Sequence, residues 1–282
     1  MTSTDLLLVG ATGFIGRALL PVLAADRTVT AVRFESPEPP DTGVEWLRLD
    51  LEDLAEALED LRPAAIVNAA ALAAPAACGA DPALARRLNV DLPAVLAGSN
   101  ARLIHLSTDQ VFDGQCGGYV ELDAPNPVSV YGETKLAGER TVRDRSPSAV
   151  VLRVNLVCGR SSGPRMSSVD VMLAAAAAGD KIPLFTDEFR SPVAMSDVVR
   201  AVAGLVEADF RGILHLGGPR LSRLELGRPI LEKHGLADRI RPMSLADYAG
   251  PPRAPDTSFD SSLAARVLGI TPRGIDKIVE LC

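Results

Sequence analysis

Tyr131 and Lys135 are the two residues whose types and spacing most directly suggest catalysis. They are four apart in a segment expected to be helical, so both side chains should lie on one face. A phenol with a pKa of about 10 donates its proton poorly at neutral pH, and a neighbouring ammonium stabilises the phenolate and lowers that pKa. We therefore expect Tyr131 to protonate a carbonyl oxygen while hydride arrives at the carbon, with Lys135 also holding a nicotinamide ribose. Such a pair also arises by chance on a protein surface, so its context matters.

A polar run, Ser107-Thr108-Asp109-Gln110, directly follows an apolar strand candidate. A hydroxyl at the end of such a strand can hydrogen-bond a substrate carbonyl and stabilise developing oxyanion charge. Thr108 is our first choice for this role and Ser107 the second, although Ser107 fits a cap of the strand end equally well. Asp109 and Gln110 are further candidates for substrate contact.

The glycine run near the N-terminus predicts a dinucleotide site. It follows the apolar stretch at residues 6–9, precedes an amphipathic segment and has the spacing G-x-x-G-x-x-G. The first glycine allows a tight turn, the second lets the backbone approach a pyrophosphate, and the third lets the helix pack closely on the strand. A glycine turn without a ligand is the alternative interpretation. The expected cofactor contacts in this run are Gly10, Thr12, Gly13, Phe14, Ile15 and Gly16.

Further cofactor contacts are expected where successive strands end, because ligands of open α/β sheets bind at the carboxyl ends of strands. Arg33 ends the second strand and suits the 2′-phosphate of NADP, whereas Glu35 nearby suits the ribose hydroxyl of NAD. We favour NADP(H) over NAD(H), although Arg33 also fits a solvated edge residue. The ends of the third and fourth strands add Asp50, Leu51, Ala69, Ala70 and Ala71, the last three directly after Asn68.

Strand and helix candidates alternate through the first half of the chain. Short apolar runs are typical of strands that are covered on both faces, and amphipathic stripes and helix caps lie between them. This alternation predicts an α/β fold with a doubly wound parallel Rossmann sheet. The strand candidates are residues 6–10, 29–34, 46–50, 65–69, 103–107 and 150–154; the helix candidates are residues 14–25, 52–61 and 129–145 and a helix that starts at Asp81-Pro82.

Beyond Asn155 the alternation is lost and prolines become frequent. We therefore expect residues 1–155 to form the dinucleotide-binding domain and residues 156–282 to form a smaller substrate-binding lobe. The segment near residues 193–216 again has the pattern of a helix followed by a strand. It is expected to return to the first domain.

Composition limits the class of protein. The chain has 282 residues, enough for one large or two modest domains, a net charge of −7 and 47% hydrophobic residues. No basic run suggests nucleic-acid binding, and no signal peptide or membrane span is predicted, so we expect a soluble cytoplasmic protein. Neither a metal site nor a disulfide framework is expected, because no C-x-x-C pair occurs among Cys78, Cys116, Cys158 and Cys282.

Together these motifs resemble those of extended short-chain dehydrogenases/reductases, and more narrowly those of the dTDP-4-dehydrorhamnose reductase group. The resemblance implies hydride transfer from a reduced nicotinamide to the keto group of a nucleotide-linked sugar, with Thr108, Tyr131 and Lys135 as the catalytic set. Dimers are common in the superfamily, so a homodimer is a further expectation. The runs that carry the resemblance are residues 10–16, 68–71, 89–90, 107–114, 131–139, 187–192 and 215–218.

The chain departs from this group at two places. Gln110 replaces a tyrosine that lines the sugar pocket in the group, and Arg165 with the next three residues replaces an Asn-Phe pair. We expect Arg165 and Arg190 to bind a phosphate or carboxylate of the substrate, or else to form ion pairs within the protein.

The sequence therefore predicts an NADPH-dependent reductase that acts on a ketone, with a nucleotide-linked 4-keto sugar as the favoured substrate. A ketoreductase acting on a non-sugar metabolite is one alternative. A sugar-nucleotide dehydratase or epimerase is another, but it needs a base that Gln110 cannot supply. A third is an NADP-binding regulatory subunit without turnover, because the regulatory subunit of methionine adenosyltransferase also resembles this group.

Overall fold

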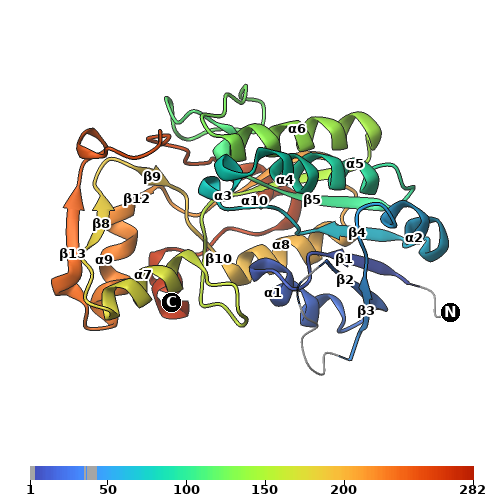
Figure 1. The fold of residues 1–282 in the computed structure, drawn as a ribbon, viewed down its shortest axis with the longest axis horizontal. Coiled ribbons are helices and arrows are strands. Elements are labelled where there is room, and N and C mark those ends of the chain that lie inside the picture. Colours follow the sequence, from blue (N-terminus) through green and yellow to red (C-terminus); the bar gives the residue numbers. More distant parts are fainter. Residues whose placement is uncertain (1–3, 35, 37–42) are drawn as a thin grey trace.

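The computed structural model describes residues 4–34, 36 and 43–282 (Figure 1). Within these residues a seven-stranded sheet forms the centre, and all of its pairings are parallel. The order across the sheet is β11 (Gly212–Leu216), β6 (Val150–Val154), β5 (Arg102–Thr108), β4 (Ala65–Asn68), β1 (Leu6–Val9), β2 (Val29–Arg33) and β3 (Glu45–Arg48). The strand order reverses between β1 and β4, which confirms the predicted doubly wound Rossmann sheet.

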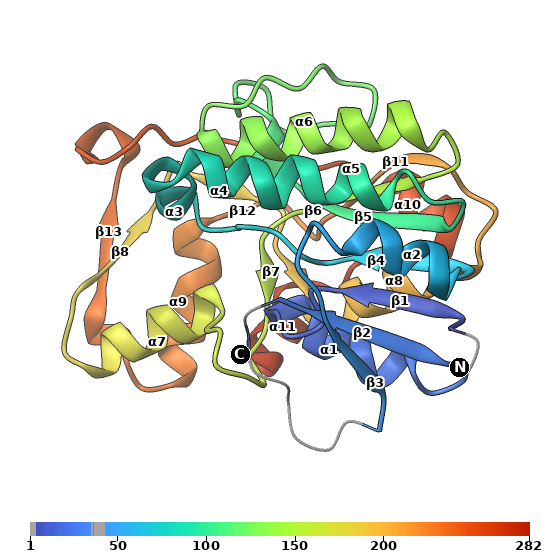
Figure 2. The same cartoon turned by 45° about the vertical axis from the view of Figure 1, so that its right-hand side comes forward.

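Helices cover both faces of this sheet (Figure 2), because the side chains of each apolar strand point alternately to either side. On one face, Leu8 and Ile104 belong to a core formed with α1 (Phe14–Leu23), α8 (Met195–Glu207) and α10 (Ser262–Leu268). On the other face, Leu7 and Leu103 belong to a core formed with α2 (Leu54–Leu61), α5 (Leu92–Leu96) and α6 (Val130–Arg145).

The strand and helix predictions are confirmed to within two residues at each end. The helix predicted at Asp81-Pro82 begins there, and the Asp81 carboxylate accepts a hydrogen bond from Leu84 N at 2.9 Å. It runs as α4 (Pro82–Arg86), a π-helical turn (Arg87–Asp91) and α5, and α3 (Pro75–Ala80) precedes it. Turns of this π-helical type are frequent at functional sites.

A second lobe, to the left of the sheet in Figure 1, has its own apolar core, which includes Leu173, Leu184 and Ile230. Its helices are α7 (Ser168–Ala177), α9 (Arg223–Lys233) and α11 (Ile275–Leu281). Three short strand pairs accompany them: β8 (Ile182–Phe185) with β13 (Ile240–Met243), β9 (Phe189–Arg190) with β12 (Leu221–Ser222), and β7 (Val157–Cys158) with β10 (Val193–Ala194).

The chain returns from this lobe to the central sheet. After β10, α8 packs on the sheet and β11 pairs with β6, where the sequence pattern places the return of residues 193–216. Helix α10 and the segment after it make a second return that the sequence pattern does not predict, since Ala264 of the helix and Ile270 beyond it also join the core of the sheet. The boundary near residue 156 stays a prediction.

Candidate active site

A cavity of about 560 Å³ opens where β1, β2, β3 and β4 end, beside the reversal of strand order. This is the place at which open α/β sheets bind ligands, and the volume is typical of small-molecule sites. Eight of the residues predicted to contact a cofactor line the cavity. They are Gly10, Thr12, Gly13, Asp50, Leu51, Ala69, Ala70 and Ala71.

The glycine turn fits a pyrophosphate because backbone packs directly on backbone there. Gly10 has a φ of +81°, and a Cβ at this position would lie 2.6 Å from Ala70 N. A Cβ on Gly16 would overlap the carbonyl oxygen of Gly10. Helix α1 begins after Gly13 with no side-chain cap and no acidic residue in its first turn. Its N–H groups and partial positive charge therefore remain available to phosphate oxygens.

Some predicted contacts lie outside the cavity lining. Residues 14–16 form the first turn of α1, behind the lining residue Gly13. The guanidinium of Arg33 donates to Ser36 O at 3.2 Å, and it is Phe34 and Ser36 that line the cavity at the end of β2. Glu35, the residue that favoured NAD, lies outside the described residues.

The π-helical turn forms a wall of the cavity that the sequence pattern does not predict. Arg87 and Leu88 line the cavity beside Leu72. Asn89, which is fully buried, fixes this wall to the loop after β4, because its side chain bonds both Leu72 N at 2.9 Å and Leu72 O at 3.2 Å. It also donates to Thr134 Oγ1 of α6 at 3.0 Å. The cofactor wall and the helix that carries Tyr131 are thus joined.

Arg165, predicted as a substrate contact, lines the same cavity as the cofactor residues. The loop that carries it, residues 159–166, passes close to the glycine turn, because a Cβ on Gly163 would overlap the Arg17 guanidinium. Arg17 Nε in turn donates to Thr12 O at 3.1 Å. Arg165 therefore belongs with the cofactor residues by position.

Thr108 and Tyr131 meet at the end of β5. Thr108 caps a short 3-10 turn and Tyr131 lies in the first turn of α6, where its side chain is buried against Cys78 and Leu72. Burial raises the pKa of Tyr131, the hydrogen bond to Thr108 opposes that rise, and the charge of Asp109 adds to it. The phenol is therefore protonated at neutral pH.

Lys135 lies one turn further along α6 and is 2% exposed. Its Nζ donates to Leu106 O at 2.7 Å and lies 3.3 Å from His105 Nε2. Burial lowers the pKa of Lys135 to about 8, and the charge of Glu139 raises it. The expectation that Lys135 lowers the pKa of Tyr131 is wrong in this structure, because the amine is directed toward β5 and burial dominates the pKa of both groups.

A layer of buried polar side chains lies between α6 and the sheet. Ser107 donates to Glu139 Oε1 at 2.5 Å, and Glu139 Oε2 lies 2.7 Å from Arg153 Nη2. Arg153 Nη1 lies 3.2 Å from His215 Nε2. The Ser107 hydroxyl is thus engaged within the protein, by a carboxylate of α6 and not as the cap of the strand end that is the alternative for this residue. Sequence reasoning missed Arg153, because nothing local marks a charged residue inside an apolar strand as buried and paired.

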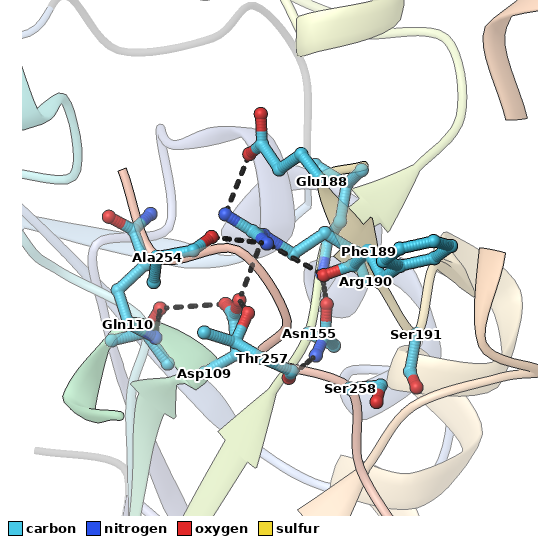
Figure 3. Close-up of polar contacts among 12 residues, drawn as sticks. Asp109, Gln110, Asn155, Glu188, Phe189, Arg190, Ser191, Ala254, Thr257 and Ser258 are labelled. Atoms are coloured by element: carbon cyan, nitrogen blue, oxygen red, sulfur yellow. Dashed lines mark hydrogen bonds and ion pairs between the residues drawn. The ribbon is translucent and has the colours of Figure 1, made fainter. Parts of the chain in front are cut away.

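Asp109 and Arg190 meet between the sheet and the second lobe (Figure 3). Arg190 Nε lies 3.4 Å from Asp109 Oδ2, and Nη2 lies 2.6 Å from Glu188 Oε1. Arg190 also donates to Ala254 O at 3.1 Å, and Thr257 donates to Asp109. Burial raises the pKa of Asp109, and the charge of Arg190 opposes that rise. Arg190 thus forms ion pairs within the protein, which is the second of the two roles that the sequence predicts for it.

The residues that the structure describes hold neither a metal-binding cluster nor a membrane-spanning helix. No group of three His, Cys, Asp or Glu side chains among them is arranged to hold a metal ion. None of their helices is both long and apolar enough to cross a membrane.

The chain has a dinucleotide cavity where the strand order of a doubly wound sheet reverses, and a helix with the Tyr-x-x-x-Lys motif lies beside β5. These features define an extended short-chain dehydrogenase/reductase, a class of NAD(P)-dependent oxidoreductases. Within this class the chain belongs to the family described as the RmlD substrate binding domain, whose model matches residues 4–280.

Two curated relatives cover nearly all of the chain. A dTDP-4-dehydrorhamnose reductase of Mycobacterium tuberculosis is 32% identical over 96% of this chain and 89% of its own length. Methionine adenosyltransferase 2 subunit beta of Mus musculus is 30% identical over 96% of this chain and 84% of its own length.

Two solved structures are similar to this chain over nearly its whole length. A hypothetical dTDP-4-dehydrorhamnose reductase from Sulfolobus tokodaii has a TM-score of 0.84 and 27% identity, covering 97% of this chain and 98% of its own. MoeE5 in complex with UDP-glucuronic acid and NAD has a TM-score of 0.82 and 29% identity, covering 98% of this chain and 97% of its own.

Proposed function

We propose that the protein is an NADPH-dependent reductase that transfers hydride to the keto group of a nucleotide-linked 4-keto sugar. The observation that carries this proposal is the meeting of the Thr108 hydroxyl and the Tyr131 phenol at the end of β5. The neighbouring strands end at the dinucleotide cavity. The relatives named dTDP-4-dehydrorhamnose reductase support the choice of substrate class.

Each residue then has a defined part. Thr108 donates to the substrate carbonyl oxygen, and Tyr131 gives that oxygen its proton. Burial raises the pKa of Tyr131, so the phenol carries the proton to be transferred, and the hydrogen bond with Thr108 opposes that rise and makes the proton easier to lose. Lys135 holds the nicotinamide ribose, and the glycine turn with the start of α1 holds the pyrophosphate. When bound in the cavity, a reduced nicotinamide supplies the hydride.

We favour NADP(H) as the cofactor and keep NAD(H) as the alternative. The Arg33 guanidinium donates to the carbonyl oxygen of Ser36, a residue that lines the cavity at the end of β2, and this supports the choice of NADP(H). Arg165 adds a second guanidinium on the cavity wall. An additional phosphate on the cofactor suits two arginines better than it suits a neutral ribose pocket.

Gln110 is the substrate contact that we favour beside Thr108. Asp109 is buried and paired with Arg190, so in this proposal the pair shapes the floor of the pocket beneath the substrate. Gln110 follows directly and is only partly buried, which leaves its amide available to a sugar hydroxyl.

The proposal is tested by mixing the purified protein with NADPH and dTDP-4-dehydrorhamnose and following the consumption of NADPH. Tyr131→Phe should lower kcat by about 100-fold or more, since it removes the acid. Tyr248→Phe is the matched control, because that ring packs on Phe185 in the second lobe. Equal turnover by Tyr131→Phe and the unchanged protein would contradict the role of Tyr131.

A regulatory subunit that binds NADP(H) without turnover is the second candidate. The similarity to methionine adenosyltransferase 2 subunit beta over nearly the whole chain favours it. This candidate predicts tight NADPH binding, no consumption of NADPH with a panel of nucleotide 4-keto sugars, and co-elution with a methionine adenosyltransferase catalytic subunit in gel filtration.

The same assays separate the remaining alternatives. A ketoreductase for a non-sugar metabolite would consume NADPH with small ketones and not with sugar nucleotides. A dehydratase or epimerase would convert a sugar nucleotide with bound NAD and without net consumption of NADPH. Sedimentation equilibrium of the purified chain tests the expected homodimer.

A further inference from the structure

Asn68 and His105 form a buried pair behind Lys135. The parallel register of β4 and β5 sets Asn68 directly beside His105, and both residues are buried. Asn68 Nδ2 lies 3.0 Å from His105 Nδ1, and His105 Nε2 lies 3.3 Å from Lys135 Nζ. At the other end, Asn68 Oδ1 accepts from Ala70 N at 3.1 Å, and Ala70 lines the dinucleotide cavity. A continuous chain of hydrogen bonds therefore runs from the cavity wall to Lys135.

The direction of each of these hydrogen bonds follows from the first one, between Ala70 and Asn68. A backbone N–H only donates, so the Asn68 atom facing Ala70 N must be the carbonyl oxygen. The amide nitrogen of Asn68 then faces His105 Nδ1, which must accept. A neutral imidazole that accepts at Nδ1 carries its proton on Nε2. That Nε2–H is directed at the nitrogen of Lys135.

An ammonium cannot accept a hydrogen bond, because it has three donors and no lone pair. A neutral amine can accept from His105 Nε2–H and still donate to Leu106 O. The hydrogen-bonding groups of Ala70, Asn68, His105 and Lys135 therefore all have suitable partners only when Lys135 is unprotonated. If Lys135 is charged, two donors must face each other at one of the three links, which costs free energy in a buried site.

We propose that Asn68 and His105 are positioning residues that fix the imidazole tautomer and thereby favour the neutral amine of Lys135 in the protein alone. Lys135 then has two states, a neutral amine held by His105 and an ammonium that can hold an anionic ligand. The catalytic use of these states rests on the proposed function, whereas the tautomer and the amine state do not.

The other groups around Lys135 act in known directions. Glu139, one turn along α6, favours the ammonium, but this carboxylate also binds Arg153 and Ser107. From β5, His105 faces the amine, and burial is the main reason why the pKa of His105 lies well below its usual value; a charge on Lys135 lowers it further. An imidazole in that state is neutral, as the hydrogen-bond directions require.

The number of lysines makes the test direct. The chain has four lysines, at positions 135, 181, 233 and 277, so lysine labelled with carbon-13 at Cε gives few resonances. We expect Lys135 to titrate near pH 8, well below the value of about 10.4 that is usual for a lysine in solution. Lys135→Met assigns the resonance. A Lys135 resonance that titrates at the usual lysine value of about 10.4 would overturn the proposal.

Two variants separate positioning by hydrogen bonds from burial alone. His105→Gln can turn its amide oxygen to Nζ, and Asn68→Leu frees His105 Nδ1 to carry the proton, so that Nε2 accepts. Each should raise the pKa of Lys135 by about one unit, because one pKa unit corresponds roughly to the free energy of one hydrogen bond to a charged group. If Asn68 and His105 acted only by burying Lys135, neither variant would raise the pKa of Lys135, and Asn68→Leu would lower it. His215→Gln, at the other buried histidine of this layer, is the control and should leave Lys135 unchanged.

A second measurement needs no variant. Nitrogen-15 spectra of labelled histidine in the unchanged protein should show His105 with a bare Nδ1 and a protonated Nε2 at pH 9, where Lys135 is neutral. The opposite tautomer would overturn the proposal even if every variant failed to fold. If the protein proves to be a regulatory subunit without turnover, both spectroscopic results still stand, so failure of the proposed function is distinguishable from failure of this inference.

Discussion

Glu139 of α6 and Arg153 of β6 form an ion pair at 2.7 Å with both side chains 2% exposed. Removing one partner leaves a buried charge uncompensated, so we expect Arg153→Met to lower the free energy of unfolding by about 3–5 kcal/mol. Urea denaturation measures this change. Arg228→Met is the control, because its pair with Glu232 at 3.8 Å is about half exposed and should contribute less than about 1 kcal/mol. Similar losses for the two variants would contradict the role of the buried pair.

Arg165→Ala should weaken cofactor binding. The guanidinium lines the dinucleotide cavity, and one charge-assisted hydrogen bond to phosphate corresponds to about a tenfold change in Kd. Fluorescence titration with NADPH measures the affinity, and the salt dependence of Kd should become shallower. Arg228→Ala on the exposed face of α9 serves as the control. If Arg165 instead contacts the substrate, the KM for the ketone will rise while the Kd for NADPH stays constant.

Arg33→Ala should reduce the preference for NADPH over NADH. The guanidinium is held beside Ser36, which lines the cavity, and it can bind a 2′-phosphate that NADH does not have. The measurement is the ratio of the two dissociation constants before and after substitution. An unchanged ratio would exclude Arg33 as the residue that selects the cofactor.

Gly16→Ala should disrupt the cofactor cradle, because its Cβ would overlap the Gly10 carbonyl oxygen. We expect loss of NADPH binding together with a lower free energy of unfolding. Gly79→Ala in α3 is the matched control, since a Cβ there meets nothing within 4 Å, and alanine favours a helix by about 1 kcal/mol over glycine. Retained binding in Gly16→Ala would show that the turn can relax.

Cofactor binding should take up a proton above about pH 8. Lys135 has a pKa of about 8 in the protein alone, and the negative charge of a bound dinucleotide favours the ammonium, which raises that pKa. Between the two pKa values the complex therefore holds one more proton than the free protein. Calorimetric titrations of NADP⁺ in buffers of different ionisation enthalpy measure this uptake. Lys135→Met should abolish it, and uptake that persists in this variant would assign the proton to another group.

The sheet and the dinucleotide cavity are predictable from sequence because their signals are local. The apolar run at residues 6–9, the glycines after it and Asp50 each belong to a short segment whose pattern already specifies a strand and its end. In a doubly wound sheet these ends must converge, so eight predicted contacts line one cavity.

The rest of the site depends on contacts between distant segments. Arg165 reaches the cofactor cavity through a loop that crosses the glycine turn. Arg153 is paired with Glu139 because α6 packs over β6, and no pattern within either segment shows this. The expected effect of Lys135 on Tyr131 fails for the same reason. Four-residue spacing puts both side chains on one face of α6, but only His105 and Leu106 on β5 determine where the amine points.

The polar layer under α6 also limits how the protein can be engineered. Apolar replacement of a buried ion pair is often neutral or stabilising, so exchanging Glu139 and Arg153 together is an obvious route to a more heat-resistant variant. The same carboxylate raises the pKa of Lys135, so its loss would lower that pKa further. Selection for thermostability at this layer should therefore shift the pH range over which the protein holds an anionic cofactor.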